Sequence, residues 1–169
     1  GLSEDIALAI DDHYRPRFAG DVLPRNDVGV AVALADKLET LAGMFGIGNL
    51  PTGDKDPFAL RRHALGVVRM LVERGLPLPF HTLTRQAFAA FPAGLLRDEA
   101  TALDEFLIER LKGYLRDGGY SAQEVDAAIH AQQLGHWSTI PKRLAAVRAF
   151  TALPEAPALA AANKRVSNI

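Results

Sequence analysis

The chain has 169 residues, about the length of one domain, and its 19 Lys and Arg against 20 Asp and Glu leave a net charge of −1. The absence of cysteine excludes disulfides, thiolate metal sites and a cysteine nucleophile. An apolar content of 49% with so little net charge excludes intrinsic disorder and disfavours nucleic-acid binding by bulk charge alone.

The N-terminal half is predicted to be helical, with turn residues between its helices. Ser3 is typical of a helix N-cap, and Pro16 keeps the segment around it irregular. Asp56 followed by Pro57 is typical of a helix start, and Gly75 of a helix end. The helices predicted here cover residues 3–11, 27–42, 56–74 and 82–91.

The C-terminal half follows the same pattern. Ser121 and Glu124 have the spacing of a capping box, in which each side chain bonds the backbone N–H of the other residue. The predicted helices cover residues 95–117, 121–133, 139–152 and 157 onward. No run of four or more residues alternates in the manner of a strand, so the predicted fold class is all-α.

The helix around Asp36 is expected to be buried on most sides. Its apolar face lies opposite a stripe of small residues with Asp36 in the middle. Between Val28 and Phe45, only Asp36, Lys37 and Glu39 are charged. A carboxylate in such a packed interior needs a cation, hydrogen-bond donors or a metal as its partner.

Arg61 lies within the apolar arc of the helix predicted at 56–74, where an unpaired arginine is rare. Two interpretations stay open. In the first, Arg61 forms a buried ion pair with an acidic residue, of which the candidates are Asp36, Asp54 and Asp56. In the second, Arg61 or Arg62 faces a phosphate group or another chain.

The residues alone identify no active site. The five histidines lack the spacing of paired metal ligands, and the nucleophile motif G-x-S-x-G is absent. The glycines between 46 and 53 fit neither a phosphate-binding loop nor a dinucleotide fingerprint. We therefore predict no catalytic residue, metal or cofactor in this chain.

Neither a membrane span nor a secretory signal is expected. The longest run of apolar residues and glycine, from Val28 to Ala35, is far short of the roughly 20 residues that cross a bilayer. The N-terminus has no basic region followed by an apolar one. We expect a cytoplasmic location. A start without Met and an end without a helix stop signal lead us to expect a piece of a longer protein.

Charge is distributed unevenly along the chain. Residues 1–54 carry a net charge of −5 and residues 137–169 a net charge of +4. This asymmetry has two interpretations: a basic surface toward the C-terminal end, or charges that only solvate helix ends and exposed faces.

Four segments together resemble one family. They are YRPRFAGD at 14–21, ALADKLETLAGMFGIG at 33–48, PTGDKDPFALRR at 51–62 and AAANKRVSNI at 160–169. In order and spacing they resemble the β subunit of the bacterial tetrameric glycyl-tRNA synthetase. The match is close over residues 14–73 and looser elsewhere, and strings of this length are more specific than a three-letter motif.

The resemblance implies an α₂β₂ ligase that joins glycine to its tRNA, with ATP and Mg²⁺ used by the separate α subunit. The implied partners are glycine tRNA and that α subunit. Residues 1–153 would belong to an HD-domain-like helical bundle, truncated at its N-terminal side. Residues 154–169 would start a linker helix toward an anticodon-binding region.

One departure from the HD pattern bears on activity. Residues 35–38 look like the last Asp-bearing helix of HD-type phosphohydrolases, in which the aspartate binds a metal. The paired His-Asp of that motif is absent from these 169 residues. The resemblance therefore implies a domain without phosphohydrolase activity.

Three functions remain open. The first is a non-catalytic tRNA-recognition module, and the second is an HD-type metal-dependent phosphohydrolase with Asp36 as a ligand. The third is a purely structural domain that docks the α subunit or other parts of the synthetase. The candidate tRNA contacts are Arg15, Arg17, Lys55, Arg62, Lys142, Arg143, Lys164 and Arg165.

Overall fold

The computed structural model describes residues 3–130 and 136–166, with the backbone alone described at 160 and 163–166. Its elements are α1 (Glu4–Asp12), α2 (Asp27–Gly46), α3 (Leu60–Glu73), α4 (Phe80–Ala89), α5 (Ala100–Asp117), α6 (Ala122–His130), the 3₁₀ helix η1 (Trp137–Thr139), α7 (Ile140–Thr151) and α8 (Ala156–Val166). The described ranges contain no strand, only an isolated bridge between Thr52 and Lys55. The predicted all-α class is confirmed.

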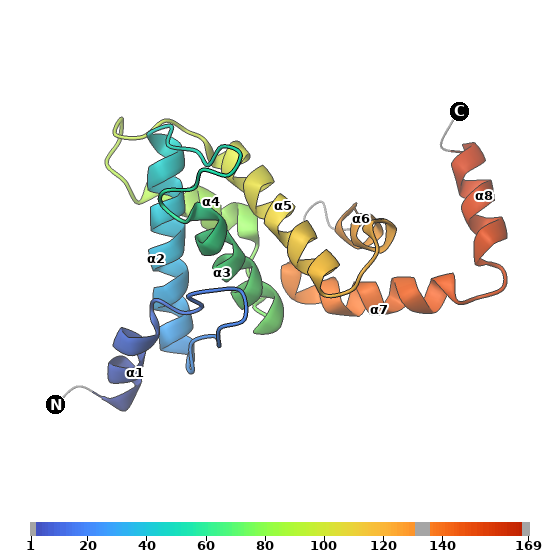
Figure 1. Cartoon of the computed structure of the whole chain (residues 1–169), viewed down its shortest axis with the longest axis horizontal. Helices are drawn as coiled ribbons and strands as arrows, with labels where there is room; N and C mark the ends of the chain where they lie inside the picture. Colours follow the sequence, from blue (N-terminus) through green and yellow to red (C-terminus); the bar gives the residue numbers. More distant parts are fainter. Residues whose placement is uncertain (1–2, 131–135, 167–169) are drawn as a thin grey trace.

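Helices α1 to α5 form the body of the molecule (Figure 1). Helix α2 packs against α1, α3 and α4, and α5 lies across α3 and α4. Beyond the end of α5, helices α6 and α7 pack against each other, and α7 leads away from the body to α8. The predicted domain boundary at 153 falls in the turn between α7 and α8, and both the boundary and the HD-like assignment stay predictions.

The core lies between α2, α3 and α5. Helix α5 places a leucine at every fourth position on one face, which is the spacing of a buried helical stripe. These leucines, at 103, 107, 111 and 115, are buried and face α3. Facing them from α3 are Val67, Val68 and Leu71, which are fully buried.

The core continues into the C-terminal helices. Trp137 stacks on Phe80 with 4.3 Å between the ring centroids, which joins η1 to the start of α4. Ile140 and Leu144 of α7 and Val125 of α6 are also buried in this extension. The α6–α7 pair is therefore attached to the body through apolar contacts.

Several helix boundaries differ from the predicted ones. Helix α2 starts as predicted at Asp27, but its N-cap is Asn26, whose side chain accepts a hydrogen bond from the Gly29 backbone N–H at 2.8 Å. It extends four residues past the predicted end because Phe45 is buried in the core. Helix α5 begins at Ala100 rather than at 95.

The start of α3 moves from Asp56 to Leu60. Ala59 adopts a left-handed conformation with φ of 53°, which interrupts the helix between the predicted and the observed start. The Asp56 carboxylate still caps the helix, accepting from the backbone N–H groups of Leu60 and Arg61 at 2.8 and 3.0 Å. The N-cap position is Ala59 and not Asp56 as predicted, although the Asp56 side chain still supplies the capping hydrogen bonds.

The capping box at the start of α6 is confirmed. The Ser121 backbone N–H donates to the Glu124 carboxylate at 2.8 Å, and the Glu124 N–H donates to the Ser121 hydroxyl at 3.3 Å. The predicted end of this helix at 133 lies outside the described residues.

Residues 13–26, here called the anchored segment, join α1 to α2 without regular structure. The fully buried carboxylate of Asp12 holds one end of it. This carboxylate accepts from the Arg25 backbone N–H at 2.7 Å and from Arg25 Nε at 3.0 Å, and it pairs with Arg15 Nε at 3.2 Å. The hydrogen bond from the Arg25 side chain is the main cause that lowers the pKa of Asp12.

The middle of the anchored segment is attached to α3. The buried Arg69 of α3 donates from Nη1 to the carbonyl oxygens of Ala19 and Asp21, at 2.9 and 2.7 Å. The Asp21 carboxylate in turn accepts from the backbone N–H and Nε of Arg17, both at 2.8 Å. Polar contacts thus fix a segment that has no helix of its own.

Truncating the core stripe of α5 tests the packing. We expect Leu107→Ala to lower the free energy of unfolding by about 2–5 kcal/mol, because it removes buried methyl groups and leaves a cavity. Leu95→Ala is the matched control, since Leu95 is exposed and its loss should change stability by less than about 0.5 kcal/mol. Urea unfolding measures both variants, and equal effects would contradict this arrangement of the core.

The anchor at Asp12 predicts an acid-dependent stability. Because its pKa is lowered in the folded state, Asp12 stabilises the fold above its ordinary pKa of about 3.8 and loses that contribution as the pH falls toward the lowered value. Asp12→Asn should lower stability at neutral pH by about 1–3 kcal/mol and flatten the acid side of the stability curve. Unfolding curves that stay parallel for the two proteins across the acid range would argue against this role.

Candidate nucleic-acid interface

A positively charged recess lies between the anchored segment, α2 and α3. Its volume is about 330 Å³, and here it is called the cationic pocket. The lining residues are Tyr14, Pro16, Arg17, Lys37, Arg62 and His63. This lining includes three basic side chains, of Arg17, Lys37 and Arg62, and no carboxylate.

Lys37 is the most unusual of these residues because it is only 3% exposed. Its methylene groups pass over Gly66 of α3, where an added Cβ would lie 2.7 Å from Lys37 Cε. Its ammonium Nζ donates to the His13 carbonyl oxygen at 3.2 Å, and no ion pair to a described carboxylate accompanies that bond. Burial lowers the pKa of Lys37, partly opposed by the nearby charge of Asp36.

The predicted buried pair of Asp36 and Arg61 does not form. Asp36 is half-buried, and within the described residues no ion pair joins it to Arg61. The Arg61 guanidinium donates instead to the Gly53 carbonyl oxygen at 2.5 Å. The buried charge of α2 stands one position later, at Lys37, four residues after the buried Ala33 on the same helical face.

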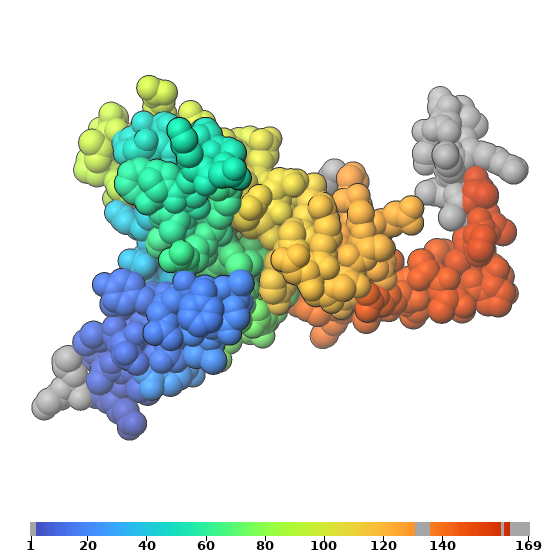
Figure 2. All heavy atoms as spheres, in the orientation of Figure 1, coloured from blue at the N-terminus to red at the C-terminus, as the bar shows by residue number. Residues whose placement is uncertain are grey.

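A second recess of about 470 Å³ adjoins the cationic pocket and shares Arg62 with it; here it is called the arginine groove. Its lining contains four arginines and two acids. The lining residues are Phe18, Ala19, Arg61, Arg62, Leu65, Glu109, Arg110, Gly113, Tyr114, Arg116 and Asp117. Figure 2 shows the segments that meet here, with the anchored segment in blue next to α5 in yellow.

Exposed aromatic rings accompany these cations. Tyr14 is 66% exposed and Phe18 is 57% exposed, and both stand on the anchored segment that lines the two recesses. Large aromatic side chains are less often exposed than charged ones. Guanidinium groups beside exposed rings are the combination that proteins use to hold phosphates and stack on unpaired bases.

The structure brings together only some of the predicted contacts. Arg17 and Arg62 both line the cationic pocket. Arg15 lies nearby, but its largely buried guanidinium pairs with Asp12 at 3.2 Å and with Asp11 at 3.6 Å. Arg15 therefore helps to hold the anchored segment in place.

The other predicted contacts lie elsewhere. Lys55 is exposed in the turn before α3, where its backbone bonds to Thr52. Lys142 and Arg143 are in the first turn of α7, outside both recesses, and Arg143 Nε donates to the Thr139 hydroxyl at 3.3 Å. The side chains of Lys164 and Arg165 fall outside the described part of the chain.

Sequence reasoning missed several cations of this face. Lys37, Arg110 and Arg116 were not among the candidates, and neither was the neutral His63, because their positions depend on how α2, α3 and α5 pack. A glycine in α3 was the available signal for Lys37, since a small residue there leaves room for a long neighbouring side chain. The Arg61–Arg62 pair had already indicated the phosphate-facing alternative.

His63 and Arg110 each keep a buried nitrogen without a hydrogen-bond partner, Nδ1 in His63 and Nε in Arg110. Burial, with a smaller contribution from Lys37, lowers the pKa of His63. The Arg110 guanidinium lies over the Phe106 ring, 5.5 Å from its centroid. Buried polar atoms without partners are uncommon in folded proteins and mark places where a further group can bind.

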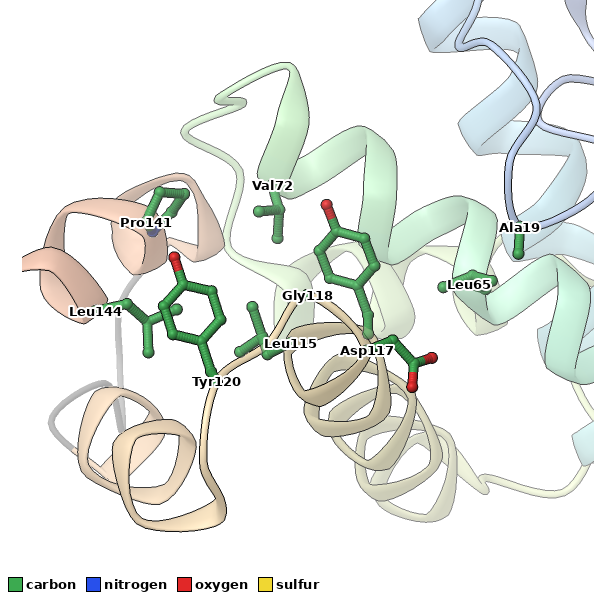
Figure 3. A pocket seen from close by; sticks show the side chains of 10 residues that line it. Ala19, Leu65, Val72, Leu115, Asp117, Gly118, Tyr120, Pro141 and Leu144 are labelled. Carbon is green, nitrogen blue, oxygen red and sulfur yellow. The ribbon is translucent and has the colours of Figure 1, made fainter. Parts of the chain in front are cut away.

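A third recess, of about 390 Å³, has a different character (Figure 3). It lies between α3, the end of α5 and the start of α7, and Asp117 is its one charged lining residue. Figure 3 shows Tyr120 beside Leu144 in this recess. Burial raises the pKa of Tyr114, another lining residue, to about 12, and its hydroxyl donates to Glu73. The recess is apolar and offers no set of polar groups for chemistry.

No metal-binding cluster is found in the described residues. No three His, Asp or Glu side chains come together there in a way that could hold a metal ion. Asp36, the ligand that the phosphohydrolase alternative requires, therefore belongs to no such group among the described residues. His81 Nδ1 and Thr84 Oγ1 do contact the Asp104 carboxylate, at 2.7 and 2.6 Å. Separately, no helix within the described ranges combines the length and apolar character needed to cross a membrane.

The fold and the two recesses define a helical module with a cationic, aromatic face. A family model described as glycyl-tRNA synthetase beta subunit matches residues 1–130. The chain is 66% identical to the glycine–tRNA ligase beta subunits of Paracidovorax citrulli and Polaromonas naphthalenivorans and 63% identical to that of Thiobacillus denitrificans, in each case over 100% of this chain and 24% of the relative. The chain therefore belongs to the glycyl-tRNA synthetase beta subunit family, and it spans about a quarter of the length of these relatives.

The burial of Lys37 predicts a gain in stability when its charge is removed. We expect Lys37→Met to raise the free energy of unfolding by about 1 kcal/mol, because methionine fills similar space without a buried unpaired cation. Lys142→Met is the matched control on an exposed turn of α7 and should leave stability unchanged. Urea unfolding distinguishes the two, and a clear loss of stability in Lys37→Met would mean that the bond to His13 outweighs desolvation.

Proposed function

We propose that this chain is a non-catalytic tRNA-recognition module of a glycine–tRNA ligase. In the whole α₂β₂ enzyme, the α subunit would join glycine to its tRNA with ATP and Mg²⁺, in the cytoplasm. Family membership supports the ligase assignment. The observation that carries RNA contact by these residues is the arginine groove together with the exposed rings of Phe18 in its lining and Tyr14 in the adjoining cationic pocket.

The groove suits an RNA backbone because its cations have fixed directions. Arg62 and Arg116 are exposed, and a guanidinium can donate two parallel hydrogen bonds to one phosphate. Tyr14 and Phe18 would stack on bases or riboses that are not paired in a helix. Because the whole chain has a net charge of only −1, the attraction is local to this face.

The acids of the groove compete weakly for these arginines. Glu109 is paired with Lys112, whose Nζ lies 2.8 Å from the carboxylate, and this contact is the main cause that lowers the pKa of Glu109. Its negative charge is thus shared with a lysine of its own helix. The exposed Arg62 and Arg116 have no ion pair to a described carboxylate and remain available to an external anion.

A structural role beside RNA contact is favoured by the C-terminal helices. Phe150 and Leu153 at the end of α7 and Leu159 on α8 are exposed apolar side chains on the part of the chain that leads away from the body. Such residues suit docking against another part of the ligase, including the α subunit. One module can perform both roles.

Binding to glycine tRNA at increasing salt tests the RNA contact. We expect measurable binding at low salt that weakens steeply as salt rises, because bound phosphates release counter-ions. The double variant Arg62→Gln with Arg116→Gln should bind more weakly and reduce the slope of log K against log salt by about two. Fluorescence anisotropy of labelled tRNA measures both quantities.

Arg85→Gln provides the matched control. Arg85 is an exposed arginine of α4 outside both recesses, so its replacement should leave affinity and salt slope nearly unchanged. The proposal would be wrong if the chain did not bind at low salt, if binding were insensitive to salt, or if the control weakened binding as much as the double variant.

A further inference from the structure

The cationic pocket contains more positive charge than its own structure uses. A lysine ammonium has three donors, and Lys37 directs one to the His13 carbonyl oxygen. Buried lysines are almost always paired with an acid, yet no such pair is found for Lys37 among the described residues. The nearby charge of Asp36 offsets part of the desolvation of this ammonium, but no described carboxylate forms an ion pair with it.

Asp36, the neighbour of Lys37 in sequence, attracts the ammonium without forming an ion pair with it, and three further acids of this region are already engaged. Asp21 accepts three hydrogen bonds from Arg17, and Asp12 is held by Arg25 and Arg15. Asp56 caps α3 through two backbone N–H groups. None of these carboxylates lines the pocket, and of its three basic residues only Arg17 forms an ion pair with a described carboxylate, that of Asp21.

The remaining pocket residues add hydrogen-bond donors and apolar surface. Arg62 is exposed at the pocket, and His63 also lines it and has a buried Nδ1 without a partner. A lowered pKa keeps His63 neutral at neutral pH, and a neutral imidazole can still donate one N–H. Tyr14 and the buried Pro16 supply apolar surface, beside which charge-assisted hydrogen bonds are stronger than in open water.

We propose that the cationic pocket binds one phosphate group, held by the Lys37 ammonium and the Arg62 guanidinium. For the source of that phosphate the inference rests on the proposed function, in which the same face contacts RNA. The phosphate belongs either to the RNA backbone or to a small phosphate compound. Bound from RNA, it would fix the register of the strand, while the arginine groove contacts neighbouring phosphates.

Gly66 makes the position of Lys37 testable without changing any charge. A Cβ at position 66 would lie 2.7 Å from Lys37 Cε and 2.9 Å from Cδ. Gly66→Ala therefore forces the flexible end of the lysine to move while alanine favours the helix. Lys37→Met instead removes the charge and does not weaken the fold, because methionine fills similar space.

The first measurement uses inorganic phosphate and pyrophosphate with the 169-residue chain. At constant ionic strength set with chloride, both anions should raise the melting temperature of the unmodified chain, because a ligand that binds only the folded state stabilises it. The rise should vanish in Lys37→Met, shrink in Gly66→Ala and persist in Lys142→Met. The second measurement is glycine tRNA affinity, which Lys37→Met should reduce by about tenfold.

The two measurements separate this inference from the proposed function. Loss of tRNA affinity in Lys37→Met assigns the phosphate to RNA, and loss of the phosphate response alone assigns it to a small phosphate compound. Salt-dependent tRNA binding that Lys37→Met leaves intact, with no phosphate response, would overturn the phosphate site and leave RNA contact standing. A phosphate response that depends on Lys37 in a chain that binds no tRNA would overturn RNA contact and leave the phosphate site standing.

Discussion

The fourteen residues between α1 and α2 form no helix, and few backbone hydrogen bonds join them, so side chains do much to hold their backbone in place. Asp12 fixes one end through Arg25, and Arg69 of α3 fixes the middle through two carbonyl oxygens. Both recesses of the cationic face have a wall made of this anchored segment. Without these polar anchors, Tyr14 and Phe18 would not be presented beside the arginines of α3 and α5.

The cations of the chain divide by what they contact. Arg15, Arg25 and Arg69 are paired with acids or carbonyl groups and hold the fold together. Lys37 and Arg62 line a recess whose lining contains no carboxylate to pair with them. Basic side chains that are neutralised within the protein thus hold the fold together, whereas those without such a partner are the proposed contacts for RNA. The net charge of the chain hides this division, because paired and unpaired cations contribute equally to it.

Local signals were sufficient for most helices and for the capping box at Ser121, because those features depend on neighbours in sequence. The long matching strings were sufficient to identify the family, because they depend only on the order of residues in the chain. The candidate site was harder to predict. A rotation of about 100° per residue decides which side chain of a helix is buried, so the shift from Asp36 to Lys37 depended on how α2 meets α3. Lys142 and Arg143 belong to the basic C-terminal third, yet folding places them apart from the arginine groove.

The close fit between Lys37 and Gly66 also ties together two positions that are 29 residues apart in the chain. A side chain at position 66 would displace the flexible end of Lys37, so residue 66 decides where the Lys37 ammonium lies. We therefore expect the effects of substitutions at the two sites to be non-additive. A shorter side chain at position 37 would remove this restriction, so the glycine matters for this contact only while the lysine is present.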